Sequence, residues 1–163
     1  MTIDWRNEMV LDKGGLDADH RLQHELIRRF VALSGEEPDR DAALKALEEL
    51  RAVSLRHFQR EERIQASIRY PHLEEHKAQH RRLAALLDDI IDQVDAPESA
   101  FSYSYVKSKA DELLQFWFFD HFAKADLKLK PHLAKFAVPK FAEPNFAEPK
   151  YAEPKFVEPK FAE

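Results

Sequence analysis

Two pairs of metal-binding side chains are each spaced four residues apart, in His57-x-x-x-Glu61 and His76-x-x-x-His80. On an α-helix this spacing places both side chains of a pair on one face, one turn apart, where they can reach the same metal ion. The carboxylate of Glu61 has two oxygens, so it can bridge two ions. Each pair alone is weak evidence, because such pairs also occur by chance on surface helices.

Three further residues extend this set. His121 and Asp126 are five residues apart. A regular helix would turn one about 140° from the other, so a local distortion or a break is needed if both point inward. His20 lies near the N-terminus. Five imidazoles and two carboxylates without sulfur suit iron, and seven ligands exceed the four that zinc takes. Two octahedral ions that share bridges could use all seven and leave one position open for a small ligand.

Prolines and apolar rows predict the helices that carry these residues. The widely spaced prolines stand where helical patterns stop or restart: Pro38, Pro71, Pro97 and Pro131. The predicted helices cover about residues 17–34, a segment after Pro38, a segment after Pro71, and a segment from near residue 99. In the first helix the apolar row is Leu22, Leu26, Phe30 and Leu33. No segment alternates apolar and polar residues, so we predict an all-α fold, an up-down-up-down four-helix bundle.

Polar side chains interrupt the inward-facing rows of the two middle helices. His57 and Glu61 stand in one row, and His76 and His80 in the other. A single buried histidine is usually a hydrogen-bonded core residue. Four such groups on adjacent rows need a common partner, because buried polar groups are costly unless they are paired or bind metal.

The C-terminal segment has a different composition. An aromatic-Ala-Glu-Pro-Lys unit recurs every five residues from Phe136 to Phe161. Proline at this frequency forbids a continuous helix, so we predict an extended or disordered tail. The predicted domains are a bundle over residues 1–133 and a low-complexity repeat tail over residues 134–163. The tail is either a solvated appendage or a docking segment for a protein partner.

Composition narrows the classes of protein. The chain has 163 residues, a formal charge of −5 and no cysteine, so disulfides and thiolate metal sites are excluded. The mild negative charge argues against nucleic acid as a partner. No stretch reaches the ~20 apolar residues of a membrane span, and residues 1–10 lack the apolar core of a secretory signal. We therefore expect a cytoplasmic protein that does not bind membranes.

Several segments resemble the hemerythrin family in order and spacing, over about residues 5–129. They are Leu16 to His20, His57 to Glu62, Tyr70-Pro71 with His76 and His80, and Trp117 to His121 with Asp126. The resemblance implies two iron ions, joined by an oxo or hydroxo group and bridged by Glu61 and Asp126. It implies one iron held by three histidines and a second, with the open position, held by two. The first three are His76, His80 and His121, and the other two are His20 and His57.

The resemblance also implies reversible dioxygen binding, for storage, delivery or sensing, with no catalytic residues. The implied oxygen pocket consists of Phe58, Trp117, Phe118 and Phe122. Family members often carry Met where Gln65 stands and Gln where Asp19 stands, which affects kinetics and autoxidation more than ligation. Two alternatives stay open. One is a di-iron enzyme acting on peroxide, oxygen or nitric oxide, such as a weak peroxidase or oxidase. The other is an oxygen-responsive interaction module whose tail docks a partner.

Overall fold

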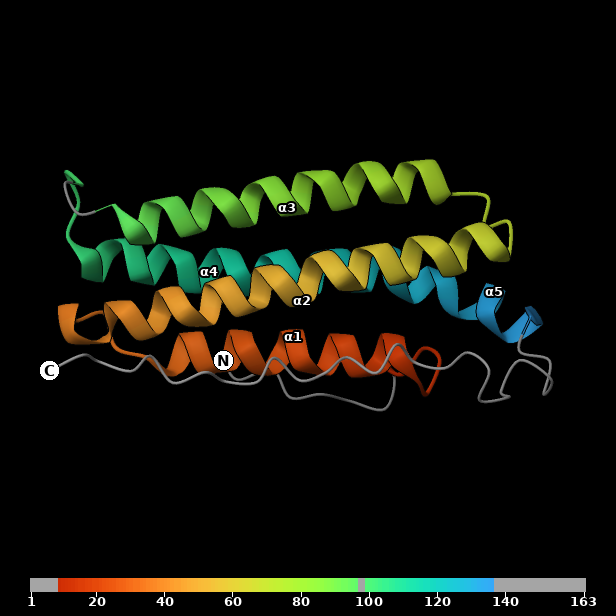
Figure 1. Cartoon of the computed structure of the whole chain (residues 1–163), viewed down its shortest axis with the longest axis horizontal. Helices are drawn as coiled ribbons and strands as arrows, with labels where there is room; N and C mark the ends of the chain where they lie inside the picture. Colours follow the sequence, from red (N-terminus) through yellow and green to blue (C-terminus); the bar gives the residue numbers. More distant parts are fainter. Residues whose placement is uncertain (1–8, 97–98, 137–163) are drawn as a thin grey trace, which may run out of the picture.

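Four long helices form a bundle in which successive helices run in opposite directions (Figure 1). In this computed structural model, residues 9–96 and 99–136 are described. The long helices are α1 (Gly15–Ala32), α2 (Arg40–Ser67), α3 (Leu73–Asp95) and α4 (Tyr103–His121). The described part of the chain contains no strand. The predicted all-α, up-down-up-down four-helix bundle is therefore confirmed.

Prolines and a capping side chain mark the helix boundaries. Pro38 lies in the short 3₁₀ turn η2 (Glu37–Asp39) that leads directly into α2. Pro71 stands in the turn between α2 and α3. At the start of α4, the hydroxyl of Ser102 accepts a hydrogen bond from the backbone N–H of Tyr105. That bond satisfies one of the N–H groups that a helix start leaves without an intrahelical partner.

Two apolar clusters fill the interior, with a polar layer between them. The larger cluster draws on all four long helices, and the smaller one consists of Leu16, Tyr70 and Leu129. On α1, His20 stands between Leu16 of the smaller cluster and Leu26 of the larger one. The polar layer is therefore closed off along the bundle axis by apolar side chains on both sides.

The predicted apolar row of α1 was wrong at Leu22, which is 44 % exposed. Each helical residue turns about 100°, so a residue two positions after His20 lies almost on the opposite side of the helix. With His20 directed inward, Leu22 must face solvent. Leu26 and Phe30 are buried as predicted.

The helical path changes pitch after α4. A π-helical segment, η3 (Phe122–Asp126), joins α4 to α5 (Leu127–Phe136). Pro131 was expected at a helix boundary, yet it lies inside α5. In a regular helix the backbone N–H of residue 131, which proline lacks, would donate to the carbonyl oxygen of Leu127. Leu127 is the first residue of α5 after the π segment, so the series of backbone hydrogen bonds is already interrupted at this position. Pro97 and the repeats from residue 137 onward lie outside the described residues, and the division into domain and tail stays a prediction.

A buried lysine fixes α4 against the end of α1. Lys107 is 2 % exposed. Its Nζ donates to the carbonyl oxygen of Leu33 at 2.9 Å and pairs with Asp111 at 2.7 Å. The same ammonium lies 4.6 Å from the ring centre of Phe30.

None of the helices in the described ranges is long and apolar enough to cross a membrane.

Candidate metal centre

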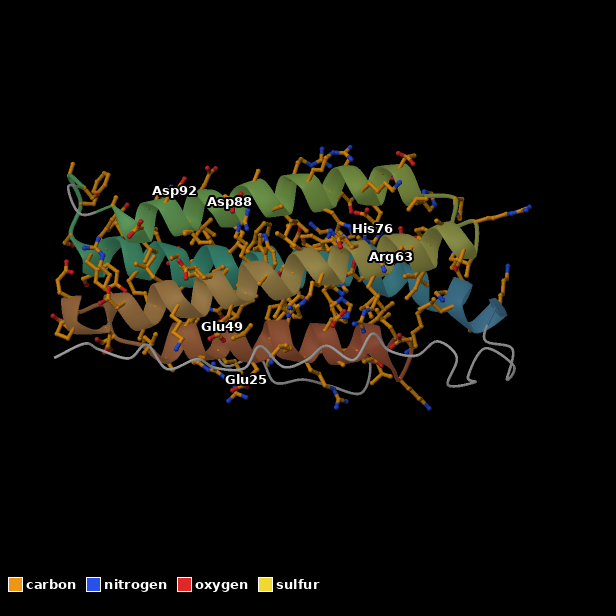
Figure 2. The ribbon with its side chains drawn as sticks, in the orientation of Figure 1. Glu25, Glu49, Arg63, His76, Asp88 and Asp92 are labelled. Carbon is orange, nitrogen blue, oxygen red and sulfur yellow. The ribbon has the colours of Figure 1, made fainter. Side chains whose placement is uncertain are left out.

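The polar layer brings all seven predicted ligand residues together. Their donor atoms form two groups, in each of which all donors lie within 4.8 Å of one another. The first group is Glu61, His76, His80, His121 and Asp126, and the second is His20, His57 and Asp126. Every one of these residues is buried or nearly so, and Glu61 is 0 % exposed. In Figure 2 the side chain of His76 lies between α3 and α2, inside the bundle.

The two carboxylates lie at the centre of the histidines. Three Nε2 atoms surround Asp126, those of His20 and His76 at 3.0 Å and that of His121 at 2.8 Å. Three Nε2 atoms also surround Oε2 of Glu61, those of His80 at 3.2 Å, His76 at 3.3 Å and His57 at 3.5 Å. His76 therefore contacts both carboxylates, and each carboxylate contacts histidines from different helices.

The π segment places the last two ligands on one face. Asp126 is the final residue of η3, and His121 is the final residue of α4. A π-helix pairs residue i with residue i+5, so residues five apart lie close to the same side of it. The local distortion that the spacing required is therefore present, whereas the alternative of a chain break between these residues is excluded.

Both carboxylates are ionised although they are buried. Burial and the neighbouring Asp126 act to raise the pKa of Glu61, but attraction to His76, His80 and His57 outweighs them and lowers it to about 2. Burial likewise acts to raise the pKa of Asp126, but the charge of His121 and hydrogen bonds from the histidines hold it well below its usual value. The pKa of His76 rises to about 10, against the effect of its burial, because it faces both carboxylates. The two buried negative charges therefore have to be balanced by positive charge at the centre of the polar layer.

Several donor atoms in this layer have no hydrogen-bond partner within the described residues. They are Nε2 of His57, His80 and His121 and both carboxylate oxygens of Glu61. Buried polar atoms nearly always have partners, and an unpartnered one is costly. Nitrogen and oxygen lone pairs that converge on one buried space are donors that a cation takes up. The residues therefore fit metal ions, and their nitrogen and oxygen donors suit first-row transition metals.

The comparison with protein families agrees with this geometry. The family model for the hemerythrin HHE cation-binding domain matches residues 14–133. The chain belongs to this family. None of the curated proteins compared with the chain matches it. The matched range contains all four long helices of the hemerythrin domain and every residue of the two donor groups.

In this hemerythrin domain, side chains outside the two donor groups contact the Nδ1 atoms of the ligand imidazoles. A histidine that binds metal through Nε2 carries its proton on Nδ1, and a group that accepts this proton fixes the ring. The Nδ1 atoms of two histidines meet such groups: His57 faces Asp19 at 3.4 Å, and His80 faces Glu62 at 2.8 Å. The Nδ1 atom of His76 instead lies 3.1 Å from the amide nitrogen of Gln65, which is a hydrogen-bond donor. Asp19 and Gln65 are the two positions where the sequence departs from the usual pattern. Their contacts with His57 and His76 were not predicted from the sequence.

A small cavity borders the metal centre. Its volume is about 10 Å³, and its lining includes His57, His121 and Asp126. A cavity of this size holds about one water-sized molecule. Of the predicted pocket residues, Phe58, Trp117 and Phe118 line it. Phe122 instead packs against His20, with 4.7 Å between ring centres.

Two lining residues of the cavity, Gln23 and Leu83, were missed by the sequence analysis. Gln23 follows His20 by three residues, so the helical repeat could have placed it beside the centre. Leu83 likewise follows His80 by three residues.

The remaining histidines lie outside the two donor groups. His24 is buried and packs against the rings of Phe118 and Phe119. His72 is exposed and lies 3.6 Å from Glu75. His132 packs edge-on against Tyr70.

Proposed function

We propose that this hemerythrin domain binds dioxygen reversibly at two iron ions, for storage, delivery or sensing. The observation that carries the proposal is the unequal division of the ligands. One donor group has five residues and the other three, and Asp126 belongs to both. An octahedral ion in the smaller group would keep a position open for a small ligand. When bound, the iron pair supplies the two electrons that dioxygen takes up and recovers them on release.

The size and lining of the cavity are evidence that the ligand is a very small molecule. It lies against His57 of the smaller group and is closed by Phe58, Trp117 and Phe118. Trp117 is held in place because its indole N–H donates to the carbonyl oxygen of Leu83 at 2.9 Å. At about 10 Å³ the space excludes organic substrates. Its aromatic walls also keep bulk water away from the centre, which slows irreversible oxidation.

The contacts of the seven ligand residues support a role for each of them. His76, His80 and His121 would hold one ion, and His20 and His57 the other. Glu61 and Asp126 would bridge the two, because each lies within 3.5 Å of histidines assigned to both ions. Asp19 and Glu62 would keep His57 and His80 in the tautomer that leaves Nε2 free.

Metal analysis together with spectroscopy tests the proposal. We expect two iron ions per chain in the purified protein. The reduced protein should gain charge-transfer absorption in air and lose it on degassing, over repeated cycles. One ion or none per chain, or an absorption change that degassing does not reverse, would contradict reversible binding.

Peroxide and nitric oxide are close to dioxygen in size, so a di-iron enzyme acting on these molecules is the second candidate. Steady-state consumption of hydrogen peroxide with an added reductant would favour it. The third candidate, an oxygen-responsive module with a docking tail, concerns residues outside the described ranges. Removing residues 134–163 and comparing bound partners with those of the full chain tests it.

A further inference from the structure

One side chain in the cavity differs in kind from the aromatic walls. Gln23, on α1, is 2 % exposed and lines the cavity together with His57 and Phe118. It lies one helical turn after His20, so it stands beside the donor group that has three residues. A leucine would fill similar space with no polar group to desolvate, and a buried amide is costly unless it is hydrogen-bonded. The amide at this position therefore requires an explanation.

Part of that explanation is a hydrogen bond between helices. The Nε2 atom of Gln23 donates to Oγ of Ser54, on α2, at 2.9 Å. Ser54 is itself 1 % exposed and precedes His57 by one turn. The bond fixes the rotation of the carboxamide beside the cavity. An amide nitrogen carries two N–H groups, and Ser54 takes one of them. No hydrogen bond within the described residues engages the other, and the side chain lines the cavity.

We propose that Gln23 is a ligand-binding residue of the cavity and that it favours small ligands carrying negative charge. This inference rests on the proposed function and extends it by naming the group that the ligand meets. A hydrogen bond to a charged acceptor is roughly twice as strong as one between neutral groups. Gln23 therefore selects for anions such as azide, and for dioxygen that has taken up electrons, over neutral molecules such as nitric oxide. Ser54 is the positioning residue that aims the amide.

Azide is a suitable probe, because it is a small anion and its antisymmetric stretch reports hydrogen bonding. The experiment uses the full iron-loaded chain with Gln23→Leu, and with Gln23→Met as a second variant of similar length. The matched control is Gln115→Leu, since Gln115 is a half-buried glutamine on α4 that donates to the carbonyl oxygen of Asp111. Iron content and melting temperature are measured for every variant, followed by azide affinity, azide stretch and nitric oxide affinity.

We expect both Gln23 variants to hold two iron ions and to bind azide about 10- to 100-fold more weakly, with a shifted stretch. Nitric oxide affinity should change less. Ser54→Ala, which keeps the amide but frees its rotation, should give a smaller loss of azide affinity and a broader band. Gln115→Leu should change none of these.

Two results would overturn the inference, and they have different meanings. If the Gln23 variants hold two irons and bind azide as tightly as the original chain, with the same stretch, Gln23 only joins α1 to α2. The proposed function then stands without it. If the original chain holds fewer than two irons or gives no azide complex, the proposed function fails, and the inference fails with it.

Discussion

The Nε2 atom of His121 lies 2.8 Å from Oδ1 of Asp126, although five residues separate the two in sequence. On a regular α-helix they would lie about 140° apart. The π segment η3 between them removes this difference. A single local change of helical pitch therefore brings the last carboxylate to histidines supplied by three other helices. Several consequences of this arrangement can be measured.

Removing one histidine should remove one ion. His20 belongs only to the smaller donor group, so His20→Ala is expected to lower the iron content from two ions to about one per chain. The five residues of the larger group stay intact and should keep their ion. His24→Ala is the matched control, because His24 is equally buried and one turn further along the same helix but lies in neither group. Elemental analysis of both purified variants checks this.

The pH dependence of stability should reverse when metal is bound. The pKa of His76 is raised from 6.5 to about 10, so its contribution to the stability of the metal-free protein is full below pH 6.5 and is lost as pH rises through 10. The pKa of Glu61 is lowered from 4.5 to about 2, so its contribution is full above pH 4.5 and is lost as pH falls through 2. The free energy of unfolding without metal should therefore be greatest between pH 4.5 and 6.5.

With metal, stability should instead rise with pH above 6.5, because the ligands must release protons to bind. Urea unfolding of both forms at a series of pH values measures the two trends. A metal-free protein whose stability increases from pH 7 to pH 9 would contradict the role given to His76.

Filling the cavity should block the ligand without removing the metal. Leu83→Phe adds a ring at the cavity wall, where about 10 Å³ is available. We expect dioxygen and azide to bind much more slowly, the iron content to remain at two, and the overpacking to cost about 1–3 kcal/mol. Leu86→Phe is the control, since Leu86 is a half-buried neighbour of the core on the same helix that does not line the cavity. Equal ligand-binding rates in the two variants would show that ligands enter elsewhere.

The buried ion pair of Lys107 should matter for stability but not for the metal. Lys107→Met leaves the carboxylate of Asp111 and the carbonyl oxygen of Leu33 without their donor. The expected loss is about 3 kcal/mol in the free energy of unfolding, with unchanged iron content. Asp111 is 25 % exposed, so water can compensate it in part. Adding Asp111→Leu should recover some of the loss, and a further loss in the double variant would contradict the pairing.

Much of the fold could be predicted because apolar residues at helical spacing indicate the long helices and prolines mark the starts of two of them. Pro38 and Pro71 mark the starts of α2 and α3 to within a few residues. The row of α1 was misassigned at Leu22, because its spacing from Leu26 fits a helix but the inward face was set by His20. The helix α5 was not predicted, since Pro131 normally argues against one.

The ligand residues could be chosen from the sequence because spacing and residue type both restrict metal binding. Their outer partners could not be chosen in the same way. Asp19, Glu62 and Gln65 are polar residues on helices rich in polar residues, and only three-dimensional packing shows that they face imidazoles. Gln23 was missed for a different reason: its spacing from His20 places it on the same helical face, but a glutamine on a helix is usually solvated.

Asp126 is the one residue that the two donor groups have in common, and this has a consequence for assembly. The group with five donors would fill first, because it offers more bonds. An ion there would fix one oxygen of the Asp126 carboxylate and leave the other, which faces His20 at 3.0 Å, already oriented. The second ion would then bind at a site whose carboxylate oxygen the first ion has already oriented. Binding of the two ions should therefore be sequential and cooperative, and molecules that hold one ion should be scarce.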